Sequence, residues 1–155
     1  MKEFTEQEIY EKLREKVFFY VTYQKRTEAE IRHNFLPLFK KYNISKNAYI
    51  DLIEELKEKG HIDDKEFVRK KFKGYLGFKL ASVKEIEHKI LKKGISRDLI
   101  DEYIEQNREM LDKYETESAK KVYEKKKAYK IDSTDEEIKE YLRRKGYREE
   151  IINHL

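Results

Sequence analysis

The sequence carries three copies of one helix-start motif at nearly equal spacing. A Ser or Thr is followed three positions later by Glu and then by Ile, and the copies that begin at Thr27, Ser82 and Thr134 lie 55 and 52 positions apart. In such a box the hydroxyl accepts a hydrogen bond from a free N–H of the first helical turn, and the Glu carboxylate accepts one from the N–H of the cap residue. The nearly equal spacing predicts three copies of one helical unit.

A residue that tolerates the left-handed backbone follows each of these helices. In the second and third copies we expect the helix to end at Gly94 and Gly146, because glycine adopts that conformation without a steric penalty. Asn43 takes this role in the first copy, where Pro37 predicts a kink or an early break. The similar segments ILKKGISRDLI at 90–100 and LRRKGYREEII at 142–152 are therefore interpreted as a helix end, a turn and a helix start.

Apolar residues at helical spacing predict one more helix before each motif and one after each turn. Examples are Ile9, Leu13 and Val17 in the first copy, and the run from Leu99 to Leu111 in the second. No segment shows the alternation of a strand. We therefore predict an all-α protein of three tandem three-helix repeats that form an elongated, curved helical array, with repeats at 1–59, 60–111 and 112–155.

The composition is that of a folded chain in spite of its high charge. Charged residues make up 44% of the chain, but the hydrophobic share of 38%, the 12 Tyr and the 8 Phe argue against disorder. The absence of Cys excludes disulfides and thiol chemistry. No apolar run is long enough to cross a membrane and the first residues are too charged for a signal peptide, so we expect a cytoplasmic protein. The net charge of +4 is spread evenly, so any anionic partner must be met by local faces.

Four strings in order resemble one known family. They are RTEAEI at 26–31, EELKEKGHIDDKEF at 54–67, KEIEHKILKKGI at 84–95 and EYLRRKGY at 140–147. Together they resemble the RecX family, which regulates the RecA recombinase, and the match runs from about residue 20 to the C-terminus. The resemblance implies three three-helix repeats, no catalysis and no cofactor. It also implies binding in the groove of the RecA–DNA filament, which limits filament growth, ATPase activity and strand exchange, with DNA bound weakly or through RecA.

Basic residues are the candidate contacts to RecA or DNA. A helix-surface cation is commonly just solvated or complements a helix end, but Lys92/Lys93 and Arg143/Arg144 fall at equivalent places in two repeats, and stacked repeats would align them along one edge. Arg26 lies within the first string of the resemblance. The candidate set is Arg26, Arg32, Lys70, Lys71, Lys92, Lys93, Arg97, Lys126, Lys127, Arg143, Arg144 and Arg148.

The segment GHIDD at 60–64 has two readings. His61, Asp63 and Asp64 look like a metal or acid–base trio, but no other residues have the spacing of further ligands. We prefer a structural interpretation, in which Gly60 ends a helix and Asp63 or Asp64 caps the next one. The full set of predicted structural caps and stops is Thr27, Asp63, Asp64, Ser82, Gly94, Thr134 and Gly146.

Three other functions compete with a RecX-like regulator. A helical-repeat module that binds DNA without RecA would use the same basic residues, and Tyr10, Tyr23, Tyr114 and Tyr129, which lie off the main apolar stripes, would stack on bases. A general protein-interaction scaffold would need neither partner. An enzyme is disfavoured because the sequence contains no nucleophile–base set, phosphate loop or paired Cys. We expect a monomer without a metal.

Overall fold

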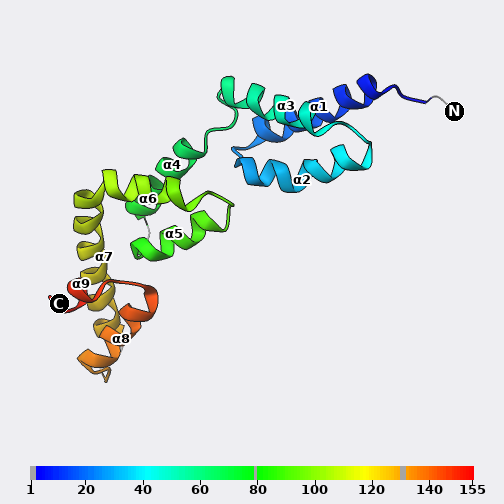
Figure 1. Ribbon diagram of the computed structural model, residues 1–155. Helices are drawn as coiled ribbons and strands as arrows, with labels where there is room; N and C mark the ends of the chain where they lie inside the picture. Colours follow the sequence, from blue (N-terminus) through cyan, green and yellow to red (C-terminus); the bar gives the residue numbers. More distant parts are fainter. Residues whose placement is uncertain (1–2, 79, 130–131) are drawn as a thin grey trace. The chain divides into compact units, whose positions relative to one another are not determined.

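The computed structural model describes residues 3–78, 80–129 and 132–155, which form helices and turns without any strand (Figure 1). This confirms the predicted all-α class. The helices of the described residues are α1 (Glu6–Tyr23), α2 (Glu28–Lys41), α3 (Lys46–Glu58), α4 (Asp64–Phe78), α5 (Val83–Leu91), α6 (Arg97–Gln106), α7 (Arg108–Tyr129), α8 (Asp135–Lys145) and α9 (Glu149–Ile152).

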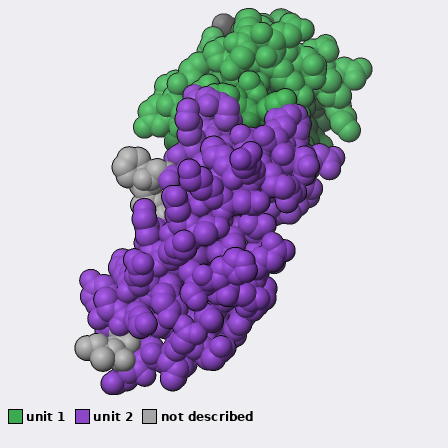
Figure 2. Space-filling model, turned by 90° about the vertical axis from the view of Figure 1, so that its left-hand side faces the viewer, with its two compact units in different colours: residues 1–67, 93–95 green, residues 68–92, 96–155 purple. Residues whose placement is uncertain are grey.

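The chain divides into two compact units (Figure 2). The first comprises residues 1–67 together with the short segment 93–95, and the second comprises 68–92 and 96–155. In the first unit α2 packs against both α1 and α3 (Figure 1). Its core brings together the apolar faces of these helices, including Val17, Ile31 and Leu56, whose side chains are fully buried. These positions follow the helical spacing of the sequence.

The second unit is built around the long helix α7. Helices α8 and α9 pack against α7 and against each other (Figure 1), and their buried residues include Ala119, Leu142 and Ile152. Near the start of the unit, Phe72 of α4 stacks on Tyr103 of α6 with ring centroids 4.6 Å apart. Stacked aromatic pairs of this kind add to the stabilisation that comes from burial alone.

Left-handed residues end the middle helices. Asn43 has a φ of 57°, and Gly94 and Gly146 have φ values of 80° and 96°. The early break that Pro37 predicts does not occur, because α2 continues through Pro37 to Lys41. A proline removes only one N–H from the helix, and a helix with a buried apolar face tolerates this loss.

The third helix of the second copy is shorter than the spacing predicts. Helix α6 ends at Gln106, Asn107 interrupts the backbone, and α7 starts at Arg108. Leu111 therefore lies in the first turn of α7, not at the end of the preceding helix. Position 111/112, where we placed the start of the third repeat, therefore lies inside α7. The apolar spacing continues from α6 into α7, so the sequence pattern does not reveal the break at Asn107.

None of the described helices combines the length and the apolar character needed to cross a membrane.

Candidate protein- and nucleic-acid-binding surface

The start of α2 is closed by a turn from much later in the chain. The Thr27 hydroxyl accepts from the N–H of Glu30 at 3.1 Å, and the N–H of Thr27 donates to the Glu30 carboxylate at 3.1 Å. The same hydroxyl donates to the carbonyl oxygen of Lys93 at 2.7 Å. A Cβ on Gly94 would lie 2.3 Å from the Cβ of Ala29, so only glycine allows this approach.

The start of α5 is built in the same way. The Ser82 hydroxyl accepts from the N–H of Glu85 at 3.1 Å and donates to the carbonyl oxygen of Lys145 at 2.6 Å. A Cβ on Gly146 would lie 2.9 Å from the Cβ of Lys84. Thr27 and Ser82 are both fully buried. Each box is therefore a local cap and also one half of a contact with a Lys-Gly turn more than 60 positions away.

A carboxylate, partly buried in Asp64 and buried in Glu115, completes each of these two helix starts. The N–H of Glu28 donates to the Asp64 carboxylate at 3.2 Å, and the N–H of Val83 donates to the Glu115 carboxylate. Burial raises the pKa of Asp64 and of Glu115, although these N–H groups act in the opposite direction. Asp64 thus does not cap its own helix α4. That role falls to Asp63, which accepts from the N–H of Glu66 at 3.0 Å.

The third motif lacks such a turn. Thr134 accepts from the N–H of Glu137 at 3.2 Å, but its side chain is exposed, and the return bond from the Thr134 N–H to the Glu137 carboxylate is not formed. The three motifs therefore share one local function, and among the described residues a second segment closes only the first two of them.

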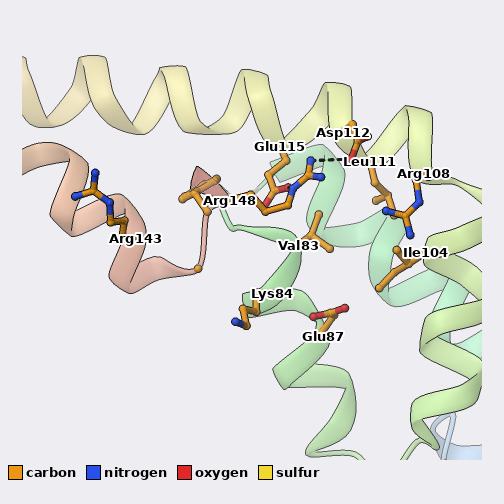
Figure 3. Close-up of a pocket in the computed structure, with 12 residues that line it drawn as sticks. Val83, Lys84, Glu87, Ile104, Arg108, Leu111, Asp112, Glu115, Arg143 and Arg148 are labelled. Atoms are coloured by element: carbon orange, nitrogen blue, oxygen red, sulfur yellow. Dashed lines mark hydrogen bonds and ion pairs between the residues drawn. The ribbon is translucent and has the colours of Figure 1, made fainter. Parts of the chain in front are cut away.

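A cavity of about 370 Å³ lies beside the start of α5 in the second unit (Figure 3). Apolar side chains of Val83, Ile104 and Leu111 form one part of its wall. The charged residues of the wall come from three helices and a turn, and they are Lys84, Glu87, Arg108, Asp112, Glu115, Arg143 and Arg148. The cavity therefore combines an apolar wall with cationic groups, as in sites that bind small polar groups.

Two predicted contact residues at this cavity are held in ion pairs. Arg143 forms a forked pair with Glu149, at 2.8 and 2.9 Å, and these hydrogen bonds raise the pKa of Arg143 and lower that of Glu149. Arg148 bonds to the carboxylates of Glu115 at 2.9 Å and Asp112 at 2.7 Å (Figure 3). These two arginines therefore shape the cavity wall and are less available to a partner than their spacing suggests.

Arg97 and Arg26 are also engaged within the protein. Arg97 lies 3.3 Å from the carboxylate of Glu87 and 3.2 Å from that of Asp101. The Arg26 guanidinium lies 4.1 Å from the ring centroid of Tyr20, and its buried Nε finds no hydrogen-bond partner among the described residues.

The other candidate cations lie nearer the surface. Arg32, Lys70, Lys71, Lys92, Lys93 and Lys127 are exposed. Arg144 is 75% exposed, and its nearest acidic partner is Glu140 at 3.8 Å. Lys126 is half-buried, with its Nζ 4.0 Å from the ring centroid of Tyr141. The structure thus places Arg26, Arg143 and Arg148 partly inside the protein, whereas Arg97 is 52% exposed even though it is paired with Glu87 and Asp101.

The sequence reasoning missed several residues of the surface. Lys84 and Arg108 line the first cavity, and a second cavity of about 330 Å³ is lined by Leu80, Val122, Lys125, Lys126, Tyr129, Tyr141 and Lys145. The tyrosine at 129 was noted as a stacking candidate, and it is 79% exposed. No local signal marks Lys84 or Arg108, because each reaches the cavity through the packing of separate helices.

The GHIDD segment is not a metal centre by its geometry. His61 packs edge-on against Phe18 with centroids 5.6 Å apart, while Asp63 and Asp64 serve different helix starts. Within the part of the chain that the structure describes, no group of three or more His, Cys, Asp or Glu side chains is arranged to hold a metal ion.

Comparisons with known proteins point to one family. No protein-family model matches the chain. The regulatory protein RecX of Staphylococcus carnosus (strain TM300) is 27% identical over 135 residues, which cover 86% of this chain and 49% of that protein. The chain therefore spans about half the length of this curated relative.

Solved structures carry the same fold. The crystal structure of RecX from Lactobacillus salivarius matches with a TM-score of 0.74 at 21% identity, over 94% of this chain and 93% of the other. A second crystal structure of a regulatory protein RecX matches with a TM-score of 0.71 at 18% identity, over 96% and 73%. The chain is therefore similar to RecX regulatory proteins in its motifs and sequence, and it shares the fold of their crystal structures.

Proposed function

We propose that the chain is a non-enzymatic regulator that binds the RecA–DNA filament and restrains it. The observation that carries the proposal is the similarity to RecX regulatory proteins, in sequence over 86% of the chain and in fold over 94%. By this proposal the helical array lies in the groove of the filament and contacts neighbouring RecA protomers. It thereby limits filament growth, ATPase activity and strand exchange without any covalent step.

The charge of the surface fits a partner made of both protein and DNA. Lys92 and Lys93 are exposed beside the turn that closes α2, and Arg144 is exposed at the equivalent end of α8. The net charge is only +4, whereas a protein that binds DNA alone is usually more basic. A periodic set of cations within a mixed surface suits a filament whose protein and phosphate groups alternate in space.

A binding comparison tests the proposal. The labelled chain is titrated with RecA assembled on single-stranded DNA with a non-hydrolysable nucleotide, and in parallel with the same DNA alone. Tight binding that requires RecA is the expected result. In a parallel assay in which ATP replaces the analogue, the chain at saturation should slow the RecA ATPase. Equal anisotropy changes with and without RecA would contradict the proposal.

A pair of variants locates the contact. Lys92→Glu/Lys93→Glu is expected to weaken filament binding about tenfold or more through loss of electrostatic complementarity. The control is Lys40→Glu/Lys41→Glu at the end of α2, where both lysines are exposed. This control has the same change in charge near a helix C-terminus, so it should destabilise its helix to the same extent. Because Lys40 and Lys41 lie outside the proposed contact set, it should bind the filament as the unmodified chain does.

One observation favours a second candidate, a module that binds single-stranded DNA directly. Among the described residues, the wall of the second cavity has three lysines, two tyrosines and no carboxylate. Aromatic rings that stack on bases beside lysines that meet phosphates are the usual elements of such sites. In this case naked DNA would bind with a steep loss of affinity in salt, and Tyr129→Ala/Lys125→Glu would abolish that binding.

A further inference from the structure

We infer that the cavity beside the start of α5 holds an acidic side chain of a protein partner, with a neighbouring aliphatic side chain of the same segment against its apolar wall. The inference rests on the proposed function only in taking the RecA filament as the natural partner. It assigns a class of contact to residues that the sequence analysis did not single out.

The apolar wall provides the first part of the argument. Val83, Ile104 and Leu111 come from α5, α6 and α7, and their side chains meet at the cavity (Figure 3). The volume of about 370 Å³ lies in the range of pockets that bind small ligands, roughly 300–1,000 Å³. An aliphatic side chain placed here would bury apolar surface from both partners.

Two cations at the rim provide the second part. Lys84 is exposed and forms no ion pair with any described residue. Arg108 pairs with Glu105 at 2.9 Å, but both side chains are more than half exposed. Exposed pairs of this kind contribute only about 0–1 kcal/mol, so Arg108 can exchange Glu105 for the carboxylate of a partner at little cost.

The acidic residues of the cavity wall limit how much negative charge a bound ligand can carry. Glu87 is paired with Arg97, and Arg148 is shared between Asp112 and Glu115. These pairs leave Lys84 and Arg108 as the cations that a ligand can meet, but three carboxylates remain in the wall. A single carboxylate fits this balance, whereas a chain of phosphates would be repelled. The second cavity, whose described lining residues include three lysines and no carboxylate, would by contrast accept a chain of phosphates.

The test variant is Lys84→Glu/Arg108→Glu. Both residues lie in the first turn of their helices, α5 and α7. Acidic side chains favour the N-terminal turn of a helix, and this gain offsets the loss of the exposed pair between Arg108 and Glu105. The double variant should therefore melt close to the temperature of the unmodified chain. A merely structural role therefore predicts no loss of binding. We expect filament binding to fall about tenfold or more, while Lys40→Glu/Lys41→Glu, which has the same change in charge and lies outside the proposed contact set, binds as before.

A peptide experiment separates this inference from the proposed function, since it needs no RecA. The isotopically labelled chain is titrated with the capped peptide Leu-Glu-Leu-Asp and with its neutral counterpart Leu-Gln-Leu-Asn. We expect the amide signals of Val83, Ile104 and Leu111 to shift with the acidic peptide alone, and this shift to vanish in Lys84→Glu/Arg108→Glu.

Each outcome decides between the hypotheses. Undiminished filament binding by the double variant overturns the inference and leaves the proposed function standing. Peptide shifts at these residues without any filament binding support the inference and contradict the proposed function. Equal shifts with both peptides, no shift up to about 10 mM peptide, or larger shifts with a short oligonucleotide than with the acidic peptide overturn the inference.

Discussion

The Ser82 hydroxyl donates a 2.6 Å hydrogen bond to the carbonyl oxygen of Lys145, 63 positions later in the chain. The Thr27 hydroxyl donates to Lys93 in the same way across 66 positions. In both cases the accepting carbonyl belongs to the residue before a left-handed glycine. One small polar side chain therefore caps a helix and fixes a distant turn against it.

Removing the Ser82 hydroxyl should lower the free energy of unfolding by more than the removal of an ordinary helix cap does. We expect Ser82→Ala to lower the free energy of unfolding by about 2 kcal/mol, with roughly half from the lost cap and half from the lost bond to Lys145. Ser96 is the matched control, since it caps α6 by accepting from the N–H of Leu99. Urea unfolding of Ser96→Ala should show a loss of about 1 kcal/mol. Equal losses for the two variants would mean that the bond to Lys145 contributes nothing.

Substituting the glycine of each closing turn should destabilise the protein more than the left-handed backbone angle alone predicts. Gly60 and Gly94 have similar φ values of 75° and 80°, but a Cβ at Gly60 would meet nothing within 4 Å. We expect Gly60→Ala to cost about 1 kcal/mol for the left-handed backbone. Gly94→Ala should cost a further 1–3 kcal/mol or so, because its Cβ collides with Ala29. Denaturant midpoints for the two variants, measured in one buffer, give the difference directly.

The buried Glu115 should leave a signature in the pH dependence of stability. Burial raises its pKa in the folded protein above the ordinary value of 4.5, so between these two values the folded state binds more protons than the unfolded state. The contribution of Glu115 to stability is therefore greatest below pH 4.5 and is lost as the pH rises through the folded pKa.

The measurement compares the unmodified chain with Glu115→Gln from about pH 3 to pH 8, a range that extends to both sides of the ordinary carboxyl pKa of 4.5. The unfolding free energy of the unmodified chain minus that of the variant should fall as the pH rises and then level off. Glu149→Gln is the opposite control, since Arg143 lowers the pKa of Glu149 and its contribution should decline as the pH drops. A flat difference curve for Glu115 would show that its pKa is not raised.

Two adjacent arginines should respond differently to charge reversal. Arg143 is 34% exposed and holds Glu149 through two hydrogen bonds, while Arg144 is 75% exposed. Arg143→Glu is expected to lower the melting temperature, because it opposes Glu149 and Glu140 with a like charge. Arg144→Glu should lower the melting temperature less, because its pair with Glu140 is long and exposed, and it should reduce filament binding several-fold. A calorimetric scan and the anisotropy titration of both variants provide the check, and the reverse pattern would exchange their assigned roles.

Local signals in the sequence predicted the helices and their ends. The box at Thr27 and the glycine at 146 each specify a helix terminus through bonds within a few residues, so the all-α class and the turns followed directly. The partner of Asp64 is Glu28, which lies 36 positions earlier. No local pattern reports such a contact, because it depends on how separate helices pack. The same limit applies to Arg143 and Arg148, whose acidic partners became visible only in the folded chain.

The short segment 93–95 belongs to the first unit although the sequence on both sides of it belongs to the second. A fragment that stops at residue 67 would keep three helices but would lose the carbonyl of Lys93 and leave the Thr27 hydroxyl without its acceptor. Dissection of this chain into smaller pieces for expression or crystallisation must therefore retain at least the first 95 residues. No single cut of the polypeptide therefore separates the two units.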